Sequence, residues 1–228
     1  MGKTTLSAAF ATALKGDKNE VVLADFKEVT PHIHKLFEME LTDKSEIYEK
    51  IENGVDAAES VKKSLKKRRG IWVFTGIGVD DFLKFQASHF EYILKVLNEE
   101  FEYVVVDTGA GIFFSSTYAA LKNSGLIFAV LAPNCWCLED TAMMIDFVCS
   151  RWNIEKSKFK AILNIADSGE IDIHTVERVL DLEAFGIRRG GKNLALDVNR
   201  MAKKLFGRGE LKECMIKTTK EVGNIGFN

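Results

Sequence analysis

Apolar runs alternate with stretches of helix-like periodicity along most of this chain. Short runs of consecutive apolar residues predict buried strands at residues 21–25, 70–75, 103–107, 126–131 and 159–164. Between them, apolar residues recur at helical spacing over residues 82–101, 115–122 and 138–152. Buried strands separated by helices are typical of a parallel sheet with both faces covered. The pattern therefore predicts an α/β fold with a doubly wound, mostly parallel sheet and helices on both faces.

No feature of the composition divides the chain. Its 228 residues are 46% hydrophobic and include only two prolines, and we find neither a low-complexity linker nor an internal repeat. A chain of this length and hydrophobicity is sufficient for one large core. We therefore expect a single domain over residues 1–228.

The start of the chain carries the first chemical signal. Gly2, Lys3 and Thr4, followed by Thr5, match the end of the phosphate-binding pattern G-x-x-x-x-G-K-[ST], whose first glycine would lie five positions before Gly2. In such loops backbone N–H groups surround phosphates, the lysine reaches the outer phosphates and the hydroxyl ligates Mg²⁺. Residues 6–14 continue as a small-residue, apolar helix, whose N-terminus favours an anion. The same tetrapeptide also begins ordinary helices. We expect an N-terminally incomplete phosphate-binding loop.

Carboxylates end two of the predicted strands. Asp25 closes the strand at residues 21–25, and Asp107 closes the strand at residues 103–107, ahead of a turn that contains Gly109. Ligands of parallel sheets bind beyond the carboxyl ends of the strands. A carboxylate at that place suits a phosphate-bound Mg²⁺, and capping of the next helix is the alternative explanation for Asp107.

Together these segments resemble the MinD/ParA family of ATPases, the deviant Walker A branch of the P-loop proteins. Residues 2–5 match the end of the family's K-G-G-x-G-K-T-T loop, residues 22–25 match its second strand, and residues 101–111 match its Walker B segment. Pro133 and Asn164 fall where the family has residues near the nucleotide base. Residues 45–60 resemble the helical insert of pilus-localising and septum-placing members. The resemblance runs through most of the chain in order and spacing.

The resemblance implies ATP and Mg²⁺ as ligands. It implies that Lys3 contacts the β- and γ-phosphates, that Thr4 ligates Mg²⁺, and that Asp107 holds the ion partly through water. Asn164 would read the adenine. The nucleotide-binding residues predicted in this way are Gly2, Lys3, Thr4, Thr5, Asp25, Asp107, Gly109, Pro133 and Asn164.

The resemblance also implies a mode of action. Members of the family typically dimerise around ATP and change partners on hydrolysis, so we expect a homodimer in the nucleotide-bound state and a protein partner. The implied role is a nucleotide-dependent dimerising switch that positions or partitions pili, septa or plasmids.

The sequence departs from the family in three places. The family's signature lysine would lie five places before Lys3, and the strand that feeds the loop would lie before Gly2. The family's second aspartate is replaced by Lys27, and a charged lysine cannot accept a proton from the attacking water. We therefore expect slow or absent hydrolysis. Either the protein begins further upstream, or it is a decayed relative that serves as a nucleotide-free interaction module.

Charge and hydropathy bear on the possible partners. The net charge of −2 gives no general attraction to nucleic acid or anionic membranes, and no apolar run reaches the roughly 18 residues of a membrane span. We therefore expect a cytoplasmic protein. Residues 62–69 include six basic residues, which suit DNA, an acidic partner or a membrane surface. A solvated helix end stopped by Gly70 explains them more simply, so direct DNA or membrane contact is not favoured.

Three further features have simple explanations. Cys135 and Cys137 have C-x-C spacing but supply at most half of a tetrahedral zinc site, so we expect buried, inert thiols, and a metallochaperone-like ATPase is the least favoured function. A loop or helix start accounts for His32 and His34. Apolar residues recur at helical spacing over residues 198–205, with basic residues between them, and this pattern predicts a core-packed helix rather than a membrane anchor.

Overall fold

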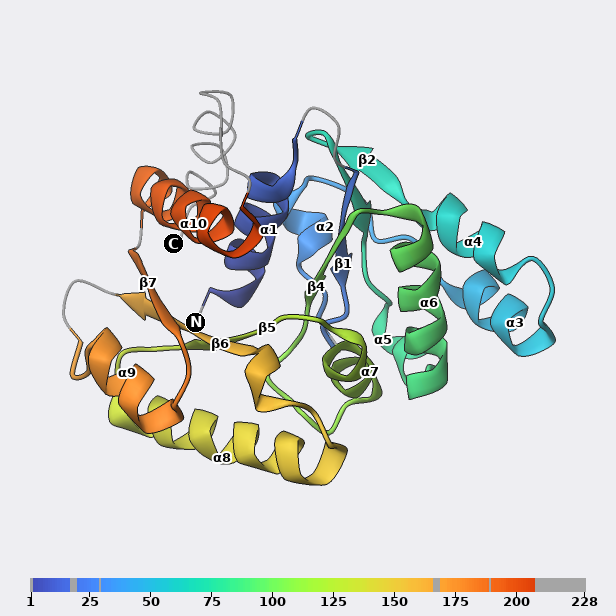
Figure 1. The fold of residues 1–228 in the computed structure, drawn as a ribbon. Coiled ribbons are helices and arrows are strands. Elements are labelled where there is room, and N and C mark those ends of the chain that lie inside the picture. The colour runs from blue at the N-terminus through green and yellow to red at the C-terminus, as the bar shows by residue number, and fades with distance from the viewer. Residues whose placement is uncertain (1, 17–19, 29, 166–168, 189, 208–228) are drawn as a thin grey trace. The chain divides into compact units, whose positions relative to one another are not determined.

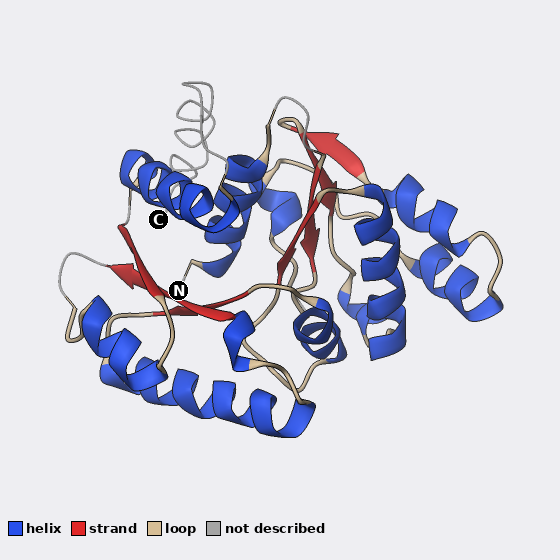
Figure 2. Cartoon of the chain, in the orientation of Figure 1, coloured by secondary structure: helices blue, strands red, loops and turns tan. Residues whose placement is uncertain are grey.

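The computed structural model describes residues 2–16, 20–28, 30–165, 169–188 and 190–207. The chain forms two compact units: one is Thr4–Asn123, and the other combines Met1–Lys3 with Ser124–Asn228. Each unit has parallel strands flanked by helices (Figures 1 and 2). This confirms the predicted α/β class, while the single domain over residues 1–228 stays a prediction.

The unit Thr4–Asn123 contains a four-stranded sheet in the order β2-β3-β1-β4. Strand β1 is buried along its whole length and runs parallel to β3 and β4, whereas β2 is antiparallel to β3. Helices α1 and α6 lie on opposite sides of β1 and β4 (Figure 1). The strands are β1 (Val21–Asp25), β2 (Lys66–Arg68), β3 (Ile71–Phe74) and β4 (Tyr103–Asp107). The helices are α1 (Lys3–Leu14), α2 (Ile33–Leu36), α3 (Ser45–Asn53), α4 (Ala57–Ser64), α5 (Val79–Phe82), α6 (Ala87–Glu100) and α7 (Ser115–Asn123).

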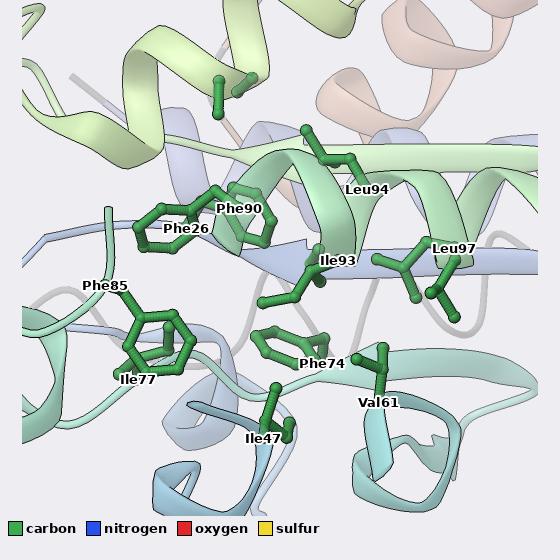
Figure 3. Close-up of a cluster of buried hydrophobic side chains, with 14 of the residues drawn as sticks. Phe26, Ile47, Val61, Phe74, Ile77, Phe85, Phe90, Ile93, Leu94 and Leu97 are labelled. Atoms are coloured by element: carbon green, nitrogen blue, oxygen red, sulfur yellow. The ribbon is translucent and has the colours of Figure 1, made fainter. Parts of the chain in front are cut away.

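An aromatic cluster forms the core of this unit (Figure 3). The ring of Phe26, just after β1, lies 5.0 Å from that of Phe90 and 6.2 Å from that of Phe74, between ring centroids. Helix α6 presents Phe90, Ile93 and Leu97 to the cluster at the spacing of one helix face. Burying these rings fixes the chain where β1 ends, and so it fixes the position of Asp25.

The basic segment at residues 62–69 differs from the prediction of a helix end. Helix α4 ends at Ser64, and the next residues form β2 at the edge of the sheet. The ammonium of Lys67 lies 3.4 Å from a carboxylate oxygen of Glu20 and 5.2 Å from the centre of the Trp72 ring. Basic side chains that project from an edge strand discourage pairing with another chain. The basic residues that suggested a solvated helix end therefore belong in part to an exposed edge strand.

The second unit contains a parallel sheet in the order β5-β6-β7. Helices α8 and α9 cover one face, and α10 covers the other (Figure 1). The strands are β5 (Ile127–Leu131), β6 (Phe159–Ile165) and β7 (Ala184–Arg188). The helices are α8 (Cys135–Trp152), η1 (Lys156–Lys158), α9 (Ile173–Leu180) and α10 (Gly191–Phe206). Val198, Met201 and Ala202 of α10 are buried, which confirms the predicted core-packed helix.

The strands thus pair as two sheets, where the sequence predicts one. Among the residues that the structure describes, β4 pairs with β1 alone, and β5 pairs with β6 alone. No described helix is long and apolar enough to cross a membrane.

Candidate functional site

Two carboxylates end neighbouring parallel strands. In the register of β1 against β4, Asp25 lies opposite Asp107, and each residue is only 1% exposed. Both strands consist of apolar residues up to these positions, so the first polar group of each strand appears at the same edge of the sheet. This is the edge at which α/β sheets bind ligands.

The first turns of α1 bring two hydroxyl groups to Asp107. The hydroxyl of Thr4 donates to Oδ2 of Asp107 at 2.6 Å, and the hydroxyl of Ser7 donates to Oδ1 at 3.0 Å. Ser7 was not among the predicted residues, although it lies three positions after Thr4 and therefore on the same helix face. A helix N-terminus, two hydroxyl groups and a buried carboxylate thus meet at one place.

Asp25 is held by the backbone. Its Oδ2 accepts hydrogen bonds from the N–H groups of His32 at 2.8 Å and Ile33 at 2.9 Å, and its Oδ1 accepts from Lys27 at 3.1 Å. Burial nevertheless raises the pKa of Asp25 to about 7, because it outweighs these hydrogen bonds and the charge of Asp107 adds to it. The carboxyl group thus organises the segment after β1 and holds a proton near neutral pH.

Lys27 is paired with a histidine of the same segment. Its ammonium lies 2.8 Å from Nδ1 of His32. Burial, reinforced by the charges of Lys27 and Lys35, lowers the pKa of His32, so its neutral ring accepts a hydrogen bond from the Lys27 ammonium. Helix α2 begins immediately afterwards at Ile33, which agrees with the helix start expected at His32 and His34.

Glu28 faces the turn after β4. Its Oε1 accepts a weak hydrogen bond from the N–H group of Gly111 at 3.4 Å. A side chain at Gly109 would overlap the Glu28 carboxylate, which lies directly over that glycine. Among the residues that the structure describes, none forms a hydrogen bond with the buried Oε2 of Glu28. The turn that follows Asp107 therefore has a second carboxylate against it, which the sequence did not suggest.

The donor set suits Mg²⁺. A hydroxyl group and a carboxylate in hydrogen-bond contact are hard oxygen ligands, and Mg²⁺ commonly takes one or two such ligands together with water and phosphate oxygens. The described residues contain no group of three or more His, Cys, Asp or Glu side chains placed to hold a metal ion. Thr4 and Asp107 therefore fit a phosphate-bound Mg²⁺ better than an all-protein metal cage.

Gly2, Pro133 and Asn164 belong to the second unit. Gly2 adopts a left-handed conformation with φ of +72°, and a Cβ at Gly2 would lie 3.1 Å from Nδ2 of Asn164. Glycine thus allows the main chain to approach the amide at the end of β6. The carbonyl group of Pro133 accepts a hydrogen bond from Glu170 at 2.9 Å. Roles for these residues, for Lys3 and for Thr5 toward a nucleotide stay predictions.

Comparisons with known proteins were informative for the fold. No family model matches the chain, and no curated protein matches it. Among solved structures, MinD in the MinC:MinD cell division protein complex of Aquifex aeolicus has a TM-score of 0.71 and 17% identity, over 93% of each chain. A ParA family ATPase from Chlorobium tepidum has a TM-score of 0.68 and 15% identity, over 96% of this chain and 92% of that one. The septum site-determining protein MinD from Pyrococcus horikoshii, complexed with Mg-ADP, has a TM-score of 0.66 and 16% identity, over 97% and 89%.

The chain has the fold of the MinD/ParA ATPases. The similarity extends over almost the whole length of these structures, which confirms the fold suggested by residues 2–5, 22–25 and 101–111. Within that fold, Thr4 and Asp107 are the predicted residues that the structure joins by a hydrogen bond.

The cysteine pair differs from the sequence prediction. Helix α8 begins at Cys135, three residues earlier than the apolar spacing indicates, and its cap is Asn134, whose side chain accepts a hydrogen bond from the N–H group of Cys137 at 2.9 Å. This phase exposes Cys135 and leaves Cys137 half-buried, so the expectation of two buried thiols was wrong. The metallochaperone-like alternative has no third metal-binding side chain beside them among the described residues.

Proposed function

We propose that this chain binds ATP with Mg²⁺ and acts as a nucleotide-dependent switch in cellular positioning or partitioning. The observation that carries the proposal is the contact of Thr4 and Ser7, in the first turns of α1, with the buried carboxylate of Asp107. The N–H groups of the helix N-terminus supply the attraction for phosphate oxygens, and Thr4 and Asp107 supply oxygen ligands for the cation. Mg²⁺, when bound, would neutralise charge on the phosphates.

The similar structures support the cellular role. They are named as cell division, septum site-determining and plasmid partition proteins, and one is a complex of MinD with MinC. We extend this role to the present chain, with a nucleotide-bound homodimer and a protein partner. ATP would favour the dimer because it binds the dimeric state better than the monomer.

Thermal unfolding and light scattering test the proposal together. The unfolding temperature would be followed with ATP, ADP or AMP, each with Mg²⁺ and with EDTA, and molar mass would be measured under the same conditions. Ligand at about 100 times its dissociation constant stabilises the folded state by about 2.7 kcal/mol. We expect ATP and ADP to raise the unfolding temperature only when Mg²⁺ is present. We expect the molar mass to double with Mg-ATP but not with ADP or AMP.

Matched variants make the test specific. Asp107→Asn would lose the Mg²⁺-dependent stabilisation, whereas Asp80→Asn, at an exposed position in α5, would keep it. Absence of stabilisation by any nucleotide would contradict ATP binding and favour the nucleotide-free interaction module. Stabilisation without a change in mass would leave ATP binding in place and contradict the dimerising switch.

A further inference from the structure

The carboxylate of Glu28 is packed against the turn after β4 rather than extended into solvent. Its side chain leaves the segment after β1 and lies over Gly109, two residues beyond Asp107. Oε1 is 3.4 Å from the N–H nitrogen of Gly111, and Oε2 is buried with no hydrogen-bond partner in the described part of the chain. A buried carboxylate oxygen loses its hydrogen bonds to water, and without a donor in the protein it does not replace them. Such an oxygen favours the binding of a ligand or water molecule that donates a hydrogen bond to it.

The turn after β4 is shaped to admit this side chain. Any side chain at Gly109 would overlap the Glu28 carboxylate, and one at Gly111 would overlap the ring of Phe114. Glycine at position 109 therefore leaves the space that the carboxylate occupies. The same turn begins at Asp107, which accepts hydrogen bonds from Thr4 and Ser7, so Glu28 packs against the turn that carries one of the proposed Mg²⁺ ligands.

The lysine that precedes Glu28 is paired with a histidine. The Lys27 ammonium lies 2.8 Å from Nδ1 of His32, and the expectation of impaired hydrolysis rested in part on the absence of an aspartate at position 27. The residue after it supplies a carboxylate that faces the Asp107 turn. The loss of an aspartate at position 27 therefore does not deprive this turn of a proton acceptor.

We propose, on the basis of the proposed ATP-binding function, that Glu28 is the catalytic carboxylate for ATP hydrolysis. Its Oε2 accepts a hydrogen bond from a water molecule and orients it toward the γ-phosphorus. The water oxygen forms a new bond to phosphorus as the bond to the β,γ-bridging oxygen breaks. The water proton passes to Glu28 and then to solvent, so that ATP and water yield ADP and inorganic phosphate. A carboxylate in this role typically contributes about 10²–10⁴-fold to the rate.

Single-turnover hydrolysis of radiolabelled ATP, measured with nucleotide affinity on the same samples, tests the assignment. Glu28→Gln keeps the size of the side chain and an acceptor for the Gly111 N–H group but cannot take up the proton. We expect the affinity of this variant for Mg-ATP to stay within about twofold of that of the unmodified chain. Its rate of phosphate release should be lower by a factor of about 10² or more. The exposed Glu40→Gln is the matched control and should change neither quantity. Thermal unfolding of each variant verifies that it is folded.

The position of the Glu28 carboxylate can be tested separately from its presence. Gly109→Ala provides an independent variant, because its methyl group displaces the carboxylate without removing it. It should lower the single-turnover rate at least tenfold at saturating Mg-ATP.

Each remaining outcome bears on a specific claim. Equal single-turnover rates for Glu28→Gln and the unmodified chain overturn the assignment. An unmodified chain that binds Mg-ATP but releases no phosphate also overturns it and leaves the ATP-binding function standing. An unmodified chain that binds no nucleotide overturns the proposed function, and the role of Glu28 falls with it.

Discussion

The hydroxyl of Thr4 donates a 2.6 Å hydrogen bond to the carboxylate of Asp107, which lies 103 residues later in the chain. The contact joins the first turn of a helix to the buried residue that ends strand β4. Both groups have oxygen atoms of the kind that Mg²⁺ prefers, and under the proposed function a bound ion would exchange this hydrogen bond for coordination. The contact therefore makes a direct prediction about the cation dependence of ATP binding.

Replacing Thr4 with valine removes the hydroxyl and keeps the shape of the side chain. We expect ATP affinity measured in Mg²⁺ to fall about tenfold, toward the value measured in EDTA, because the variant lacks one of the proposed Mg²⁺ ligands. Ser7→Ala removes only the second hydrogen bond to Asp107 and should cost less. Titrations of both variants with a fluorescent ATP analogue, with and without Mg²⁺, measure this. An unchanged Mg²⁺ dependence in Thr4→Val would rule Thr4 out as a ligand.

The raised pKa of Asp25 predicts a pH dependence of stability. Because this pKa is about 7 in the folded chain and ordinarily 3.8, the folded state binds a proton that the unfolded state lacks between those values. The free energy of unfolding should therefore fall as pH rises through this window, by at most about 1.4 kcal/mol per pH unit, and should level off above pH 7. Asp25→Asn should remove this slope, whereas Asp80→Asn should retain it.

Urea unfolding at pH 4.5, 5.5, 6.5 and 7.5 in EDTA measures the slope attributable to Asp25. EDTA is needed because a cation near the carboxylate would lower its pKa. If Asp25→Asn and the unmodified chain have the same pH dependence, the proton is not held at Asp25.

Strands made of continuous apolar residues were predictable from sequence. The bounds of β1 and β4 agree with the predicted ranges, since each run is closed by an aspartate. Strand β2 was not predictable in this way, because its Lys66, Lys67 and Arg68 make an exposed edge whose pairing depends on the neighbouring β3. Helix α9 and strand β7 also escaped prediction; α9 buries only Val176 and Leu180, too few positions to establish a period.

Only those residues of the candidate site that belong to sequence motifs were predictable. Thr4 and Asp107 follow known spacing patterns, and the structure brings them together. Glu28 lies in an irregular segment with no periodicity, and its relation to Gly109 depends on how two loops fold against each other. Exposure of Cys135 depends on the residue at which α8 begins, and helix starts are uncertain by several residues from sequence alone.

Two leucines provide a matched test of the core around α6. Leu97 is completely buried in the cluster of Figure 3, whereas Leu83 at the end of α5 is 83% exposed. Leu97→Ala should lower the free energy of unfolding by about 2–5 kcal/mol, since it removes buried methyl groups and leaves a cavity. Leu83→Ala should change it by less than about 0.5 kcal/mol. Urea unfolding of both variants measures the difference, and equal losses would contradict the packing described for α6.

Lys44 is a buried amine without a carboxylate partner among the described residues. Its ammonium lies 3.3 Å from the Thr75 hydroxyl and 4.9 Å from the centre of the Phe74 ring. Burial lowers its pKa from 10.5 to about 7. Between these values the unfolded state binds a proton that the folded state lacks, so stability should rise with pH by at most about 1.4 kcal/mol per pH unit.

Lys44→Met keeps the length of the side chain and removes the charge. We expect this variant to be more stable than the unmodified chain at pH 6, where the buried ammonium carries its full cost, and to lose the rise in stability between pH 7 and 10. Lys95→Met, on the exposed face of α6, should retain that rise. Urea unfolding across this range tests Lys44 separately from Asp25, because the Asp25 slope lies below pH 7 and has the opposite sign. A Lys44→Met variant that is less stable at pH 6 would mean that its contacts with Thr75 and Phe74 outweigh the cost of burying the charge.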